Sequence, residues 1–315
     1  MPDELRKPIQ LLPIFQERVW GSDTLAPFFG GAPLADRIGE VWFTFAENET
    51  SLDQSLGELL TEHPEILGEA ADPQHPGICP ILVKLLFTTS KLSVQVHPDD
   101  AYAKAHHGSL GKTEAWYVLE SQPPGELAVG FRQEISRQQL RESALSGKIE
   151  RLLNWQPVSA GDVIYTPAGT VHAIGAGLTI CEIQQNSDIT YRLYDYGRPR
   201  ELHLDHAANV AHLGPRDYKM SPKPLADWRD HLVDSEYFRV ERLHPKGPIQ
   251  ISGDLPYYLI LICVKGWGKI ADQPTTAGEA WFIPAAGEPV LLEAAGSEWI
   301  LTYAAKEPLS GIAAV

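Results

Sequence analysis

Short runs in which hydrophobic and polar residues alternate recur along the chain, and this period of two is typical of half-buried β-strands. Residues 91–97 show it most clearly, because their apolar and polar side chains fall on opposite faces of an extended strand, and the polar face carries Ser93, Gln95 and His97. A continuous apolar run at residues 80–87, interrupted only by Lys84, predicts a buried strand. We expect further strands at residues 38–43, 113–119, 127–131, 163–166, 178–184 and 190–194.

Two segments have a helical pattern instead. In residues 51–68, leucines recur at positions 52, 56, 59 and 60, which is the spacing of one helix face, and Ser51 or Ser55 is a candidate N-cap. Residues 136–155 form the second helical segment, with Ser136 as its N-cap and Gly147 as a break between two helices. Both segments are expected as insertions in a strand-rich N-terminal domain.

The last third of the chain has a different character. Prolines and scattered charges mark residues 213–228 as a linker. Short apolar runs separated by Gly, Pro and Asp turns follow it, at residues 237–243, 257–264, 268–271, 280–284, 290–292 and 299–303. We therefore expect a mainly β protein with a first domain at residues 1–230, which carries the helical insertions, and a purely β domain at residues 231–315.

Composition narrows the possible partners. The chain has 41 acidic and 26 basic residues, a net charge of −15, which disfavours nucleic acid and anionic membranes as partners. The longest clear apolar run, residues 257–264, is too short to span a membrane, and the first residues lack the apolar segment of a secretory signal. Three well-separated cysteines indicate buried thiols in a reducing compartment. We expect a cytoplasmic monomer.

The segment GDVIYTPAGTVH, residues 161–172, carries the most specific pattern. It predicts a strand, a turn fixed by Pro167 and Gly169, and a second strand that turns His172 inward. This spacing resembles the second conserved motif of the cupin superfamily, whose fold is a jelly-roll barrel and whose histidine at this place is a metal ligand. His97 and Glu114 would complete a zinc site with one open position, and Gln95 is a candidate fourth ligand.

Longer segments give a closer resemblance. Residues 82–100, 111–119, 166–198 and 200–207 are similar to type I mannose-6-phosphate isomerases, the phosphomannose isomerase family, in their short bacterial form. The resemblance implies two cupin-type jelly-roll barrels, one zinc ion per chain held by His97, Glu114 and His172, with Gln95 as a fourth ligand, and an active-site arginine at Arg192. Residues 278–284 repeat the spacing of residues 161–167 without a following histidine, so the second barrel is expected to be metal-free.

The implied reaction interconverts mannose 6-phosphate and fructose 6-phosphate through a cis-enediol, so the substrate is a small sugar phosphate. We expect Arg192 to stabilise the enediolate or the phosphate, unless it forms an ion pair with Glu182 or Asp195. Lys112 shares a strand face with Glu114, and neighbouring cations would lower its pKa and let it shuttle protons.

Three further side chains are candidates for the same site. Glu182 is a possible catalytic base, although His97 or a zinc-bound water is an alternative. Lys84 either lines the pocket or lies on an edge strand, and Ser93 is positioned to donate a hydrogen bond to the phosphate.

Other functions remain open at this point. A cupin with these ligands can hold iron or manganese and act as a dioxygenase. The protein could also bind a sugar phosphate without catalysis, or isomerise another aldose.

Overall fold

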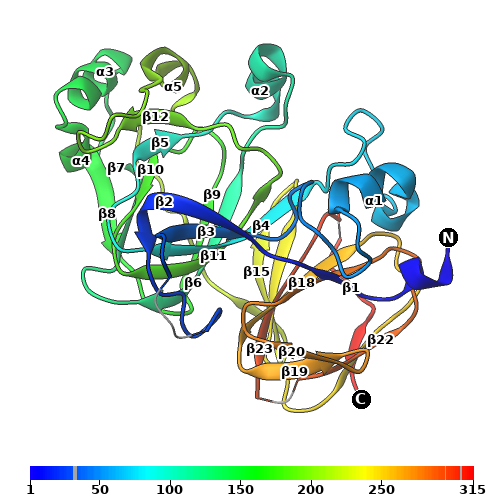
Figure 1. The fold of residues 1–315 in the computed structure, drawn as a ribbon. Helices are drawn as coiled ribbons and strands as arrows, with labels where there is room; N and C mark the ends of the chain where they lie inside the picture. Colours follow the sequence, from blue (N-terminus) through cyan, green and yellow to red (C-terminus); the bar gives the residue numbers. More distant parts are fainter. Residues whose placement is uncertain (31–33, 295, 306) are drawn as a thin grey trace.

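The structure, a computed structural model, describes residues 1–30, 34–294, 296–305 and 307–315. Strands predominate in it and form four sheets, and the few α-helices lie mostly beside the N-terminal half (Figure 1). Apolar clusters lie between the sheets, so that they stack as two β-sandwiches. This arrangement confirms the predicted mainly β fold.

The first sandwich contains the predicted site. Its seven-stranded sheet has the order β13 (Lys219–Met220), β9 (Val163–Thr166), β6 (Glu114–Ser121), β11 (Leu178–Gln185), β4 (Ile81–Thr88), β3 (Ile38–Trp42) and β2 (Ile14–Ser22). The facing five-stranded sheet has the order β12 (Tyr191–Tyr194), β5 (Val94–Val96), β10 (His172–Ile174), β7 (Glu126–Phe131) and β8 (Leu153–Pro157). Apolar side chains from both sheets meet between them, among them Leu86, Trp116, Leu127 and Ile174.

The second sandwich takes most of its strands from the end of the chain. Its seven-stranded sheet has the order β1 (Ile9–Leu11), β21 (Ala280–Ile283), β18 (Leu259–Lys265), β23 (Glu298–Tyr303), β16 (Arg239–Leu243), β15 (Arg229–Asp234) and β14 (Lys223–Ala226). Its five-stranded sheet has the order β20 (Gln273–Thr276), β19 (Trp267–Ile270), β22 (Val290–Glu293), β17 (Ile249–Ile251) and β24 (Ile312–Ala314). The domain boundary near residue 230 stays a proposal. Strand β1 comes from the start of the chain but belongs to the seven-stranded sheet of the second sandwich.

Residues 213–228 are more than the linker that their prolines predicted. They contain β13, which pairs with β9, and β14, which pairs with β15. The prolines fit because both strands lie at sheet edges, where a missing backbone N–H leaves no ladder partner unsatisfied. The segment therefore connects the two sandwiches while adding an edge strand to each.

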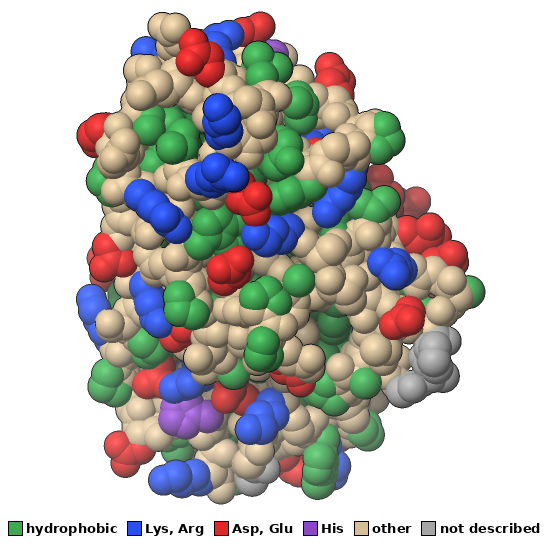
Figure 2. Space-filling view, turned by 90° about the vertical axis from the view of Figure 1, so that its left-hand side faces the viewer, with side chains coloured by type: hydrophobic (Ala, Val, Ile, Leu, Met, Phe, Trp, Pro, Cys, Tyr) green, Lys and Arg blue, Asp and Glu red, His purple; other side chains and the backbone are tan. Residues whose placement is uncertain are grey.

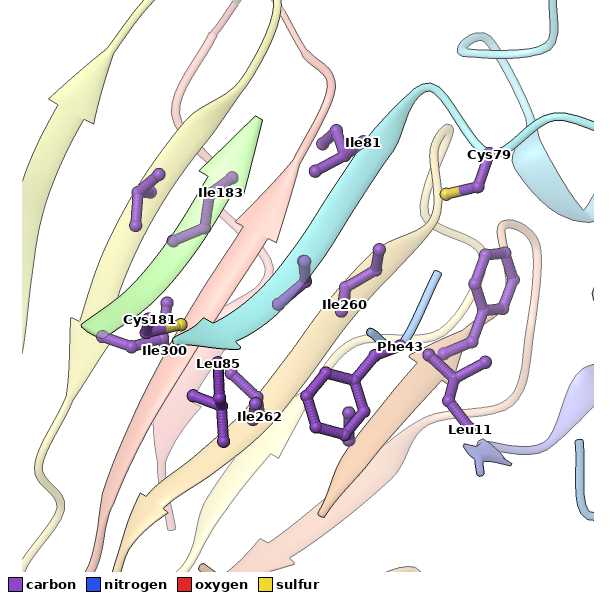
Figure 3. Close-up of a cluster of buried hydrophobic side chains, with 14 of the residues drawn as sticks. Leu11, Phe43, Cys79, Ile81, Leu85, Cys181, Ile183, Ile260, Ile262 and Ile300 are labelled. Carbon is purple, nitrogen blue, oxygen red and sulfur yellow. The ribbon is translucent and has the colours of Figure 1, made fainter. Parts of the chain in front are cut away.

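The two seven-stranded sheets pack face to face through a shared apolar core (Figure 3). Strands β4 and β11 contribute Ile81, Leu85, Cys181 and Ile183 to it, and the second sandwich contributes Ile260, Ile262 and Ile300. Side chains alternate along a strand, so the opposite faces of β4 and β11 point into the first sandwich. Both strands are consequently buried on two faces, as the continuous apolar run at residues 80–87 predicted.

Both predicted helical segments exist but are shorter than expected. Helix α1 (Leu56–Glu62) begins after Ser55, whose side chain forms a capping box with Glu58, and Pro64 starts a separate 3-10 turn, η2 (Pro64–Leu67). The second segment divides at Gly147 into α3 (Arg137–Leu145) and α4 (Ile149–Leu152). The helical prediction for residues 153–155 is wrong, because this part of the chain pairs with β7 as strand β8.

Two helices border the site without having been predicted. Helix α2 (Asp100–His107) lies between β5 and β6. Asp99 accepts a hydrogen bond from the Tyr102 N–H at its start, and left-handed Gly108 ends it. Helix α5 (Leu204–Val210) follows β12. In the part of the chain that is described, no helix combines the length and apolarity needed to cross a bilayer. Figure 2 shows the side of the molecule at the left of Figure 1, where basic and acidic side chains lie interspersed.

Candidate metal and substrate site

Three predicted ligands converge inside the first sandwich. His97 follows β5, Glu114 begins β6 and His172 begins β10, and one donor atom from each lies within 4.8 Å of the others. Nε2 of His97 is 3.3 Å from Glu114 Oε1, and Nε2 of His172 is 3.6 Å from Glu114 Oε2. All three side chains are buried. The group therefore has the composition and the spacing of a metal site with two imidazoles and a carboxylate.

The turn before His172 explains part of this convergence. Gly169 has φ +84°, a left-handed conformation that favours glycine, and a Cβ there would lie 2.9 Å from the carbonyl oxygen of Val210. Its N–H donates to the His97 carbonyl oxygen at 2.8 Å. The turn thus ties the end of β5 to the start of β10, as its proline and glycine predicted.

Hydrogen bonds from Nδ1 fix both imidazoles, so that Nε2 carries the lone pair that could bind a metal ion. Nδ1 of His97 donates to the carbonyl oxygen of Ile189 at 2.7 Å, and Nδ1 of His172 donates to that of Thr170 at 3.0 Å. In the neutral rings the Nε2 lone pairs consequently face Glu114. Neither Glu114 oxygen has an aligned hydrogen-bond donor in the described structure, although the ammonium of Lys112 is 2.9 Å from Oε1. Lone pairs that face one another in this way fit a bound cation.

The protonation states agree with metal binding. Burial lowers the pKa of His97 and lowers that of His172 to about 4, so both rings are neutral at pH 7. Burial raises the pKa of Glu114, but the ammonium of Lys112 outweighs burial and holds that pKa well below its usual range. The site therefore offers two neutral nitrogens and one carboxylate.

Gln95 lies next to this group, on the row of the sheet that also holds His172 and Arg192. Its Nε2 is 3.2 Å from Nε2 of His172, and its Oε1 accepts a hydrogen bond from Ser93 Oγ at 3.0 Å. Half a turn of the amide would exchange these two atoms and direct the oxygen toward the ligand group, with Ser93 then accepting from the amide nitrogen. Ligation by Gln95 stays a prediction.

A cavity of about 440 Å³ opens beside the ligand group, and every other predicted site residue lines it, namely Lys84, Ser93, Gln95, Lys112, Glu182 and Arg192. Lys84 and Glu182 are direct partners across β4 and β11, on the strand faces opposite the core of Figure 3. Lys84 Nζ donates to Gln184 Oε1 at 2.8 Å and lies 3.5 Å from Glu182 Oε2. Lys84 is therefore a pocket residue, and the edge-strand alternative is wrong because β4 lies between β11 and β3.

The two acid–base candidates have pKa shifts with different causes. Burial lowers the pKa of Lys112, but the carboxylates of Glu114 and Glu182 outweigh burial and leave that pKa raised. The lowered pKa expected for Lys112 beside zinc and another cation concerns the metal-bound site and stays a prediction. Burial and the charge of Glu114 raise the pKa of Glu182, against the opposing effect of Lys84. Lys112 is thus protonated at pH 7, and Glu182 binds a proton more readily than an ordinary carboxylate.

Arg192 differs from the other cations of the cavity. Within the described ranges it has no carboxylate at ion-pair distance, whereas Lys84, Lys112 and Arg200 each have one. Its Nη1 donates to the carbonyl oxygen of Glu201 at 3.0 Å, and its Nε is buried without a hydrogen-bond partner. The alternative of an ion pair with Glu182 or Asp195 is not found, and Asp195 pairs with Arg198 and Arg200 instead. The Arg192 charge is available for an anionic ligand.

Several cavity residues were not predicted, and they are Arg18, Glu40, Asp188, Arg200 and His203. Arg18 lies on β2, Glu40 on β3, and the other three in the segments around β12. No alternation or spacing near them in the sequence indicates a site. The resemblance over residues 166–198 and 200–207 includes Asp188, Arg200 and His203, although it assigned them no role.

Comparisons with known proteins agree with these observations. A family model described as "Phosphomannose isomerase type I, catalytic domain" matches residues 9–133. Mannose-6-phosphate isomerase from Streptococcus mutans is 35% identical over 282 residues, covering 84% of this chain and 87% of that protein. Mannose-6-phosphate isomerase ManA from Bacillus subtilis is 35% identical over 300 residues, covering 88% and 93%.

Solved structures lead to the same group of proteins. Mannose 6-phosphate isomerase from Bacillus subtilis superposes with a TM-score of 0.85 at 31% identity, covering 94% of this chain and 99% of that chain. A putative mannosephosphate isomerase from Archaeoglobus fulgidus gives a TM-score of 0.79 at 23% identity, with 96% and 99% covered, and supports the fold alone.

Proposed function

Because this chain belongs to the type I phosphomannose isomerase family and is an isomerase, we propose that it interconverts mannose 6-phosphate and fructose 6-phosphate through a cis-enediol with one zinc ion per chain. The observation that carries the proposal is the buried group of His97, Glu114 and His172 beside a cavity that contains the unpaired Arg192. Zinc suits these ligands and, when bound, would polarise the substrate oxygens as a Lewis acid. Gln95 is the proposed fourth ligand.

Glu182 is the proposed base, because its raised pKa increases its affinity for a proton taken from carbon. It would remove the proton from C2 of the aldose and return it to C1. Lys112 would meanwhile move a proton between O2 and O1, a role that its place on the cavity wall beside Glu114 supports. The sugar regains as many protons as it loses in these steps, so the product is an isomer.

The remaining residues would bind and orient the substrate. Arg192 would stabilise negative charge on the enediolate or the phosphate, because no protein carboxylate neutralises it in the described structure. Lys84 and Ser93 are proposed to hydrogen-bond the substrate from the cavity wall. Family membership disfavours the dioxygenase alternative.

We further propose a cytoplasmic monomer. Its support is the acidic composition and three cysteines that are all buried and unpaired.

A coupled assay tests the proposal. Purified protein is given mannose 6-phosphate before and after chelation, and again after zinc is restored. We expect fructose 6-phosphate to form, to disappear on chelation and to return with zinc. Glu114→Gln is the matched control, because it should lower the zinc content while the fold persists. Turnover that survives complete removal of metal would refute the metal assignment, and no turnover with zinc bound would refute the substrate assignment.

A further inference from the structure

His203 is attached to Arg192 by two reciprocal hydrogen bonds. The His203 backbone N–H donates to the Arg192 carbonyl oxygen at 2.8 Å, and the Arg192 backbone N–H donates to His203 Nδ1 at 3.2 Å. Because Nδ1 accepts a hydrogen bond, the proton of the neutral ring is on Nε2. The ring therefore supports the backbone of Arg192 with one nitrogen and retains a donor on the other.

The position of His203 distinguishes it from the ligand group. Arg192, Gln95 and His172 are neighbours in one row across β12, β5 and β10, and His203 joins the row beyond Arg192, on the side away from His172. His203 and Arg192 both line the cavity. Neighbouring strands lie about 4.8 Å apart, so this end of the cavity is several ångströms farther from the ligand group than Gln95 is.

Among the residues that the structure describes, none accepts a hydrogen bond from His203 Nε2. The carboxylate oxygen Oε2 of Glu201 lies 3.9 Å from it, and the Glu201 side chain is 83% exposed. Arg200, on the same wall, is held by two hydrogen bonds to Asp195. Burial lowers the pKa of His203, and Arg192 contributes in the same direction while Glu201 opposes it. The ring is thus a neutral donor at pH 7.

We propose that His203 determines specificity for the phosphate end of the substrate, by donating a hydrogen bond from Nε2 to a phosphate oxygen and by holding Arg192 beside that group. The inference rests on the proposed function, since it assigns the phosphate of the sugar to the end of the cavity away from the ligand group. A six-carbon open-chain sugar places its phosphate at the opposite end from the reacting C1 and C2 atoms. Arg192 supplies positive charge at that end of the cavity, and the Nε2–H of His203 orients the phosphate through a hydrogen bond.

Two substitutions separate the two roles of this ring. His203→Asn keeps a polar atom near the position of Nδ1, and therefore the support of the Arg192 backbone, but removes the distal donor. His203→Ala removes both. For His203→Asn we expect KM for mannose 6-phosphate to rise roughly tenfold with kcat nearly unchanged, since a hydrogen bond to a charged group is lost. For His203→Ala we expect the same rise in KM and a fall in kcat, because Arg192 loses its support.

The control is His106→Asn, which makes the same substitution at an exposed histidine that does not line the cavity. Inorganic phosphate binding is measured in parallel by calorimetry on the zinc-loaded protein, and thermal unfolding confirms that each variant is folded. We expect weaker phosphate binding in His203→Asn and unchanged binding in His106→Asn.

The outcomes keep the two proposals apart. If the unmodified protein does not turn over mannose 6-phosphate, the proposed function fails, and phosphate calorimetry still decides the role of His203. If the protein is active but His203→Asn alters neither KM nor phosphate binding, the role of His203 is refuted. A fall in kcat alone in His203→Asn would also refute it, because that pattern indicates a role at the reacting atoms.

Discussion

The core between the two sandwiches predicts that both unfold together, and Ile262→Ala tests this. Ile262 is 1% exposed on β18 and belongs to the same cluster as Leu85 and Cys181 of the first sandwich (Figure 3). The substitution removes three buried carbon groups, at about 0.8 kcal/mol each. A residual cavity adds roughly 1 kcal/mol, so we expect a loss of about 3–4 kcal/mol. For a chain of 315 residues the unfolding entropy is about 0.7 kcal/mol/K, which gives a fall in Tm of roughly 5 °C.

Leu261→Ala is the matched control for Ile262→Ala. Leu261 is the next residue of the same strand and equally buried, but its side chain points into the second sandwich. Calorimetry of both variants should give one transition that moves by a similar amount, since the two cores belong to one cooperative unit. Two separate transitions, with Ile262→Ala shifting them by less than about 1 °C, would contradict the reasoning.

Three further predictions concern the site. Arg192→Ala should lower kcat by about 10²–10³-fold at unchanged zinc content. The control Arg216→Ala, at an exposed arginine, should leave kcat unchanged. Near-normal turnover in Arg192→Ala would refute the proposed role of Arg192 in stabilising negative charge on the substrate. Glu182→Gln should lower kcat by about 10²–10⁴-fold, measured in the same coupled assay, with zinc content from elemental analysis as the control. Burial lowers the pKa of His172 from 6.5 to about 4, so unfolded chains bind this proton more readily than folded ones. The stability of the metal-depleted protein should therefore be full above about pH 6.5 and fall toward pH 4 in urea titrations, and His172→Gln should fall less steeply over that range.

The parts of the site that could be predicted depend on local geometry. A strand places residues two apart on one face, so Gln95 and His97 were assigned together. A Pro-Ala-Gly turn of fixed shape placed His172. These relations extend over about a dozen residues, and the sequence displays them directly.

The parts that could not be predicted depend on distant pairing or on weak patterns. His203 reaches the cavity only because it bonds to the backbone of Arg192, and nothing in its neighbours indicates that contact. Helix α2 had a cap at Asp99 and a terminating Gly108, but only Ala103 is buried in it, so the helix lacks an apolar face to recognise. Strand β8 follows helix α4 directly, and no change in the spacing of apolar residues marks where the helix ends. This segment is extended because it pairs with β7.

Lys84 shows why the second sandwich matters to the site. A lysine in a buried strand is costly unless its charge is compensated, and here Gln184, Glu182 and the ring of Trp42 surround its ammonium. These groups compensate the charge only if β4 and β11 keep their register. The apolar faces of the same strands are covered by the second sandwich, so the burial that stabilises the molecule also fixes the positions of Lys84 and Glu182. A domain that contributes no residue to the proposed zinc ligands can thus still be required for the geometry of the cavity, because it covers the back of the sheet from which the polar side chains project.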